Sequence, residues 1–207
     1  MEKRHIIISI GRECGSGGHE IGEKLAERYG IKFYDHNILD LLAEETGKDP
    51  GELAKLEESV SGWLPARKGG FADKEKDLMN RLSESDRMYL YERALIQRLA
   101  AKESFVIIGR GANPVLEQDP DTLRLYVYAP DAFKIPRVKE YYHLDSDKDA
   151  EKKMNQVDKE RKEYFEYYTG KVWGGKDCHD FAVDSSMFGI DGTVELIAAI
   201  ADKKFGL

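Results

Sequence analysis

The sequence has 207 residues, of which 41% are hydrophobic and 34% charged, as expected for one soluble α/β domain that carries an insertion. A formal net charge of −7 excludes the basic footprint of a protein that binds a nucleic acid polymer. No apolar run is long enough to span a membrane, Met1 to Ser9 is too short for a signal peptide, and two cysteines without a secretion signal predict a cytoplasmic protein.

The stretch Ile6 to Gly22, IIISIGRECGSGGHEIG, combines an apolar run, several glycines and a helical pattern. Its opening residues lack polar alternation, which predicts a strand buried on both faces. A glycine loop before a helix offers backbone N–H groups and the positive end of the helix dipole, which together bind phosphate. We therefore predict a nucleotide-binding loop. Its candidate residues are Gly11, Gly15, Ser16, Gly17, Gly18, His19 and Glu20.

The loop departs from the Walker A pattern G-x-x-x-x-G-K-[ST]. If Gly11 opens it and Gly17 closes it, the loop is one residue too long, Gly18 stands in the Lys position and His19 in the Ser/Thr position. Three of the glycines also fit the G-x-x-x-G-x-G pattern of short-chain dehydrogenases. A glycine-rich turn without any ligand is the third interpretation.

A second short strand is predicted at Ile31 to Asp35, which places Asp35 at the carboxyl edge of a parallel sheet, where ligands bind. Asn37 is suited to cap the helical run Ile38 to Thr46. A longer helical pattern follows from Asp73 to Lys102. Because its Met and Tyr side chains are expected to be exposed, this helix is also a candidate surface for a homodimer.

Three further strands are predicted at Phe105 to Gly109, Leu123 to Ala129 and Phe181 to Val183, with a final helix at Thr193 to Lys204. Arg110 directly follows the first of these strands, so it should face whatever the glycine loop holds. Strands separated by helices predict an α/β fold with a five-stranded parallel sheet and helices on both faces.

Two helical segments carry the remaining charged candidates. Asp131 to His143 follows the fourth strand and contains Lys134 and Arg137. Asp145 to Tyr168 is almost entirely charged and aromatic, so a pair of solvated helices and a functional flap both fit it. The spacing of Asp158 and Arg161 on one helical face favours the flap.

A dehydrogenase would use Asp35 to bind a ribose, and Tyr167 with Lys171 as a catalytic pair. However, Tyr167 lies in the charged flap, and helices interrupt the alternation of strands and helices that such a fold requires. Phosphoryl transfer accounts for more of the sequence, because its transition state requires positioning and positive charge. The cations placed for that chemistry are Arg110, Lys134, Arg137 and Arg161.

Over nearly its whole length the chain resembles the cytidylate kinase-like family of P-loop nucleoside monophosphate kinases. The resemblance rests on the glycine loop, on FYDHNIL, on FVIIGRGAN followed by LRLYVYAPDAFKIPRV, on the D-x-x-R spacing in the flap, and on FAVDSS. It implies a P-loop core formed by residues 1–36, 103–144 and 178–207. It also implies a helical acceptor-binding insertion at about 37–102 and a lid at about 145–177.

The resemblance further implies ATP and Mg²⁺ as cofactors and a nucleoside monophosphate, or a similar small acceptor, as substrate. Arg137 and Arg161 would close on the transferring phosphate with Lys134 as a further catalytic cation. The substrate contacts implied or expected are Asp35, Asn37, Arg110 and Asp158.

Family members carry Gly-Lys where this chain has Gly17 and Gly18, and Asp where it has Gly111. The missing Lys normally bridges the β- and γ-phosphates. One interpretation is that another residue substitutes for it, and the other is that the protein binds a nucleotide and regulates without fast transfer. The candidate substitutes are Arg12, Ser16, His19 and Lys134.

Overall fold

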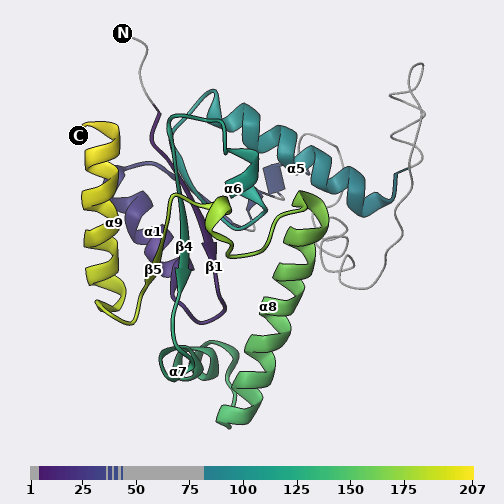
Figure 1. Cartoon of the computed structure of the whole chain (residues 1–207), viewed down its shortest axis with the longest axis vertical. Coiled ribbons are helices and arrows are strands. Elements are labelled where there is room, and N and C mark those ends of the chain that lie inside the picture. Colours follow the sequence, from purple (N-terminus) through teal and green to yellow (C-terminus); the bar gives the residue numbers. More distant parts are fainter. Residues whose placement is uncertain (1–4, 36, 39, 42, 44–81) are drawn as a thin grey trace. The chain divides into compact units, whose positions relative to one another are not determined.

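The computed structural model describes residues 5–35, 37–38, 40–41, 43 and 82–207 (Figure 1). The chain divides into two compact units, one formed by Met1–Asp35 with Gln97–Leu207 and the other by His36–Ile96. The first unit contains the sheet and the glycine loop. The predicted helix after Asn37 and the first part of the one predicted from Asp73 lie largely outside the described residues.

The sheet of the first unit has five parallel strands in the order β2-β3-β1-β4-β5, which confirms the predicted sheet. The strand β1 lies at its centre, with Ile8 opposite Val106 of β3 on one side and Leu123 of β4 on the other. The strands are β1 (Ile7–Arg12), β2 (Lys32–Tyr34), β3 (Phe105–Ile108), β4 (Thr122–Tyr128) and β5 (Phe181–Asp184).

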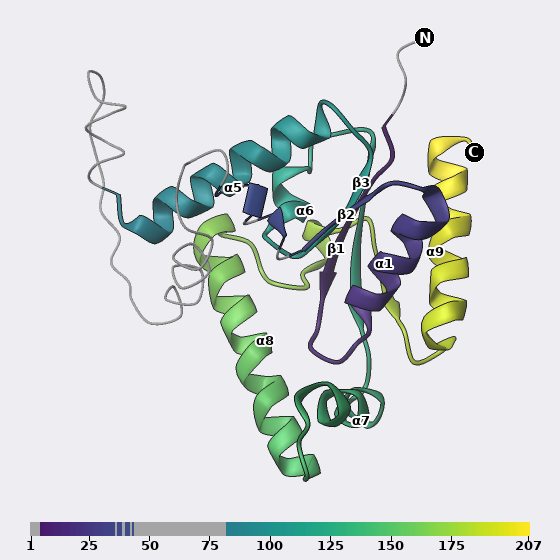
Figure 2. The same cartoon turned by 180° about the vertical axis from the view of Figure 1, so that it is seen from behind.

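Helices cover both faces of this sheet, as predicted. Figures 1 and 2 show α1 (Gly18–Tyr29) and α9 (Gly189–Phe205) on one side, and α6 (Ala112–Val115) and α8 (Asp147–Thr169) on the other. Apolar side chains of β1, β3, β4 and β5 pack with those of α1 and α9 into a continuous core. Because every strand of this core is a short apolar run, the sheet is rigid where it supports the glycine loop.

The strand order separates this fold from a dinucleotide-binding fold. Dinucleotide-binding sheets follow the order 3-2-1-4-5-6, whereas here β3 lies between β1 and β2. The two residues that would form a dehydrogenase pair are also not arranged as one, since Lys171 donates to both carboxylate oxygens of Glu117 at 2.7 Å. The dehydrogenase interpretation is therefore not supported by the fold.

The helical segments differ from expectation in two places. The charged segment is one continuous helix, α8, rather than a pair, because no Gly or Pro interrupts it between its Ser146 cap and Gly170. The helix α9 begins at Gly189, four residues before the predicted start. Two other helices are α5 (Glu84–Ala100), within the run predicted from Asp73, and α7 (Asp131–Tyr142), which packs against α8.

The described helices contain no stretch that is both long and apolar enough to cross a membrane. The Met and Tyr side chains of α5 were expected to be exposed, but Met88 and Tyr89 are buried, and only Tyr91 of the three, together with Leu90, is exposed. A homodimer through this helix stays a prediction, as does a cytoplasmic location.

Candidate phosphate-binding site

The glycine loop connects the carboxyl end of β1 to the first turn of α1. Gly15 and Gly17 have φ angles of 78° and 81°, in the left-handed region that glycine adopts without steric cost. Gly17 directly precedes α1 and has no capping side chain. The first N–H groups of a helix have no acceptor within the helix, so the amides of Gly18, His19 and Glu20 form a site suited to an anion.

Three hydrogen bonds fix the loop backbone. The Cys14 N–H donates to Oδ1 of Asp158 at 2.7 Å, the Ser16 hydroxyl donates to the Glu13 carbonyl at 2.8 Å, and the Ser185 hydroxyl donates to the Ser16 carbonyl at 2.6 Å. Helix α8 and the segment after β5 therefore hold the loop in place through hydrogen bonds.

Apolar packing fixes the same loop from below. Cys14 is buried in a small cluster with Val138 of α7 and with Ala150 and Met154 of α8. Burial raises the pKa of the Cys14 thiol, which keeps the sulfur protonated and unreactive at neutral pH. Cys14 thus fills space beneath the loop.

Lys134 of α7 is buried and paired with two carboxylates. Its Nζ donates to Oε2 of Glu13 at 2.8 Å and lies 3.1 Å from Oδ1 of Asp131. Burial opposes the charge, but the hydrogen bonds to Glu13 and Asp131 outweigh it and raise the pKa of Lys134. Lys134 is therefore charged and held against the loop residue Glu13.

Arg137 lies one turn further along α7 and is more accessible. Its Nη2 donates to Oε2 of Glu20 at 2.9 Å, and its guanidinium stands 5.6 Å from the centre of the Phe133 ring. A Cβ atom added to Gly17 would lie 3.5 Å from the same Nη2. Arg137 thus presents a partly exposed cation directly beside the start of α1.

Asp158 and Arg161 of α8 form an ion pair at 3.4 Å. Because burial disfavours the charged carboxylate, it raises the pKa of Asp158, against the opposing effects of the Cys14 N–H and Arg161. Asp158 was predicted to contact a substrate, and the structure places its carboxylate on the loop backbone. Arg161 lies beside it and remains partly exposed.

The carboxyl end of β3 holds three consecutive residues in left-handed conformation. Gly109, Arg110 and Gly111 have φ angles of 72°, 57° and 59°. Such a conformation costs a residue with a Cβ atom roughly 1–2 kcal/mol, and such strain concentrates at functional sites. The buried Arg110 is thus held at the edge where ligands bind by a backbone that the sequence would not otherwise favour.

Asn113 was not predicted as a site residue, although it lies in α6, two residues after this turn. Its side chain accepts from the Ser9 hydroxyl and donates to the Leu125 carbonyl at 3.0 Å. These bonds connect β1, α6 and β4 beneath the loop. The sequence signal was a polar residue in the short helix after a buried strand, but its partners are distant in sequence.

Asp35 follows β2 and bonds two cations of the loop. Its Oδ2 lies 2.9 Å from Nδ1 of His19, and its Oδ1 lies 3.7 Å from Nη2 of Arg12. The hydrogen bond to Asp35 raises the pKa of His19, with burial acting against it and Glu23 adding to it. Asp35 thus links the end of β2 to both ends of the glycine loop.

The raised pKa of His19 gives a pH-dependent contribution to stability. A raised folded-state pKa stabilises the protein fully below the unfolded value of 6.5, and the stabilisation disappears as the pH rises through the folded-state value. We expect His19→Gln to cost about 0.5–1 kcal/mol at pH 5.5, since the half-exposed pair is screened by solvent, and less at pH 8.5. Urea unfolding at both pH values measures this difference.

The matched control for this prediction is the same substitution in an Asp35→Asn background. There the cost of His19→Gln should depend much less on pH, because the main cause of the raised pKa is absent and only Glu23 still favours the charged imidazole. An equal cost at both pH values in the wild-type background would contradict the assignment.

The structure brings most predicted site residues together within the first unit. Gly11 lies in β1 below the loop, and Asn37 belongs to the second unit, where its carbonyl accepts from the Asp40 N–H at 3.2 Å. The remaining ones surround the loop or the adjacent strand ends: Gly15, Ser16, Gly17, Gly18, His19, Glu20, Asp35, Arg110, Lys134, Arg137, Asp158 and Arg161.

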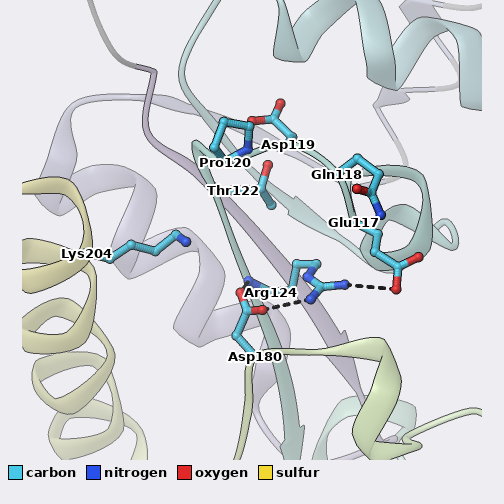
Figure 3. A pocket seen from close by; sticks show the side chains of 8 residues that line it. All are labelled: Glu117, Gln118, Asp119, Pro120, Thr122, Arg124, Asp180 and Lys204. Carbon is cyan, nitrogen blue, oxygen red and sulfur yellow. Dashed lines mark hydrogen bonds and ion pairs between the residues drawn. The ribbon is translucent and has the colours of Figure 1, made fainter.

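A separate hollow of about 230 Å³ lies at the other end of the sheet, where β4 and β5 begin. Figure 3 shows that its central cation, Arg124, already pairs with Asp180 at 2.8 Å and with Glu117 at 3.8 Å. Because ligands of parallel α/β sheets bind at the carboxyl ends of the strands, this hollow is not the candidate site. Among the described residues, no group of three His, Cys, Asp or Glu could hold a metal ion.

Comparison with known proteins shows the family of the chain. A sequence profile of the cytidylate kinase-like family matches residues 7–187. The chain is 28% identical over 198 residues to the cytidylate kinase of Methanopyrus kandleri, covering 95% of this chain and 93% of that protein.

Two of the solved structures that are similar to this chain illustrate its relatives. An uncharacterized protein from Eubacterium ventriosum has a TM-score of 0.67 and 27% identity, over 96% of this chain and 99% of that one. A shikimate kinase from Bacteroides thetaiotaomicron has a TM-score of 0.56 over 95% and 98% of the two chains, and at 11% identity it shows a shared fold alone.

Proposed function

Because the chain belongs to the cytidylate kinase-like family, we propose that it transfers the γ-phosphoryl group of ATP to a nucleoside monophosphate, with cytidylate as the first candidate acceptor. The observation that carries this proposal is the preformed glycine loop at the start of α1, with Arg137 beside it. The relative from Methanopyrus kandleri supports cytidylate as the acceptor to test first.

ATP would bind with its phosphates on the loop amides. The N–H groups at the start of α1 and the helix dipole favour the negative phosphate oxygens. The partly exposed Arg137 would contact the transferring group, where negative charge spreads over three oxygens in the transition state. Its pairing with Glu20 keeps the guanidinium oriented before a nucleotide arrives.

The acceptor would bind at the ends of β2 and β3. Arg110 follows β3 and Asp35 follows β2, and these neighbouring parallel strands end at the same edge of the sheet. An Arg and an Asp there supply one group for the acceptor's phosphate and one for its hydroxyl or base. In-line transfer between two substrates bound at one edge requires no covalent intermediate.

Mg²⁺ is compatible with this arrangement without a preformed cage. In such sites Mg²⁺ takes one or two carboxylates and completes its shell with phosphate oxygens and water. Glu20, which pairs with Arg137, and Asp35, which pairs with Arg12, are carboxylates beside the loop, so they would hold the ion or its waters. When bound, Mg²⁺ neutralises charge on the β- and γ-phosphates.

A second candidate function is nucleotide binding without fast transfer. The observation that favours it is the residue pair Gly18 and His19, where a catalytic loop carries Lys and Ser or Thr. Such a protein would bind ATP and regulate through its bound state.

A turnover assay that quantifies ADP and phosphorylated product separates the two functions. ATP and Mg²⁺ are supplied with cytidine monophosphate, with other nucleoside monophosphates, and with small hydroxyl acceptors such as shikimate. We expect ADP formation that depends on a nucleoside monophosphate. Tight ATP binding with no acceptor-dependent ADP would overturn the kinase proposal and favour the regulatory one.

A further inference from the structure

The P-loop Lys is missing from this chain, and the structure points to the residue that replaces it. We infer that Arg12, the last residue of β1, supplies the cation that contacts the β- and γ-phosphates, and that Gly18 is a glycine because the Arg12 side chain lies over it. This inference rests on the proposed nucleotide site and names a residue of its machinery.

The first observation concerns the space above Gly18. A Cβ atom added to Gly18 would lie 2.6 Å from Cβ and 3.1 Å from Cγ of Arg12. Real side chains do not approach so closely, and the contact is with the stem of Arg12, which cannot rotate away without moving its backbone. A Lys side chain in place of Gly18 therefore could not fit beside the present Arg12. The site has room for one long cationic side chain, and in this chain that side chain comes from β1 and not from α1.

The second observation concerns the guanidinium. A Cβ atom added to Gly109 would collide with Nη1 of Arg12, so the guanidinium lies against the backbone at the end of β3. Its Nη2 is 3.7 Å from Oδ1 of Asp35 at the end of β2, and the side chain is 16% exposed. Two glycines thus leave room for one side chain, and a carboxylate orients it across the edge where both substrates would bind.

The third observation is the state of the other candidate cations. Lys134 is held by Glu13 and Asp131, and His19 is bonded to Asp35. Arg12 is also paired, with 3.7 Å between its Nη2 and Oδ1 of Asp35. It differs from Lys134 and His19 in its guanidinium, which matches a phosphate with two parallel N–H···O bonds.

The exclusion between the two positions yields a transplant experiment. Arg12→Ala should lower the turnover number about 10²–10³-fold, the usual effect of removing one charge-stabilising donor. It should also bring the ATP and ADP affinities, measured by calorimetry, closer together. Gly18→Lys alone should be inactive, because the introduced side chain collides with Arg12. The double variant R12G/G18K should recover at least tenfold over R12G, since removing the Cβ of Arg12 opens the space above Gly18 and the helix then delivers the cation.

Arg28→Ala is the matched control, because Arg28 lies at the far end of α1 and pairs with the exposed Glu195. It should change neither turnover nor the affinity ratio. If Gly18→Lys and the double variant fail to fold by circular dichroism, Arg12→Lys takes their place and should keep activity above that of Arg12→Ala.

An Arg12→Ala protein with wild-type turnover and a wild-type ratio of ATP to ADP affinity would overturn the inference. If the wild-type protein binds ATP but transfers nothing, the kinase proposal fails while the affinity ratio still decides the role of Arg12. If it binds neither nucleotide, both proposals are overturned.

Discussion

Replacing Gly15 with Ala is expected to destabilise the protein by about 2–4 kcal/mol and to remove ATP binding. Gly15 has a φ angle of 78°, where an L side chain is strained. A Cβ atom there would also lie 2.8 Å from Cγ2 of Val138 and 2.9 Å from the Lys134 carbonyl oxygen. The carbonyl belongs to helical backbone and cannot rotate away, so the loop itself must move and its amides lose their alignment.

Urea unfolding and ATP calorimetry measure both effects, and Gly30→Ala is the control. Gly30 ends α1 with a φ angle of 60° and has no atom within 4 Å of the added Cβ. Its substitution should cost only the backbone strain, about 1 kcal/mol, and leave ATP binding intact. Equal costs at the two glycines would show that the contact with α7 is unimportant.

Replacing Arg137 with Ala is expected to lower the turnover number about 10²–10³-fold with a much smaller change in ATP affinity. The reason is that Arg137 stands beside Gly17 at the start of α1 and would meet charge that develops during transfer. Arg137→Lys should retain part of the activity, because it keeps the charge but loses the planar fork. Steady-state kinetics with the preferred acceptor measure each variant.

Lys139→Ala is the matched control on the same helix. Lys139 pairs with the exposed Asp147 at 2.7 Å, away from the loop, so its removal should leave turnover unchanged. If Arg137→Ala raised only the KM for ATP and kept the turnover number, Arg137 would be a ground-state binding residue and its assignment to the transition state would be wrong.

The sheet could be predicted from sequence because its strands are short, continuous apolar runs such as Phe105–Ile108. Their order could not, since pairing β3 between β1 and β2 depends on contacts between residues about a hundred positions apart. The charged segment was compatible with a pair of solvated helices or with a functional flap, because its composition suggested solvent exposure. The uninterrupted run after Ser146 was the better indicator of one long helix.

Only the local features of the candidate site could be predicted, for the same reason. The glycine loop and the strand-end Arg110 follow from local pattern, because each lies directly after a buried strand. The hydrogen bonds between Asp158 and Cys14 and between Asn113 and Ser9 join residues more than a hundred positions apart. No local sequence pattern predicts them. The contact of Arg12 with Gly18 could not be predicted for a different reason. Both residues belong to the motif, but only the three-dimensional structure shows that the Arg12 side chain occupies the space above Gly18.

The hydrogen bond from the Cys14 amide to Asp158 makes α8 and the glycine loop thermodynamically dependent on each other. A ligand on the amides of Gly18 to Glu20 and the docked position of α8 act on the same loop. By thermodynamic linkage, the free energy by which the docked helix strengthens ligand binding equals the free energy by which the bound ligand stabilises the docked helix. Because α8 is 23 residues long, ligand binding at the loop would then also affect the position of the distant end of this helix.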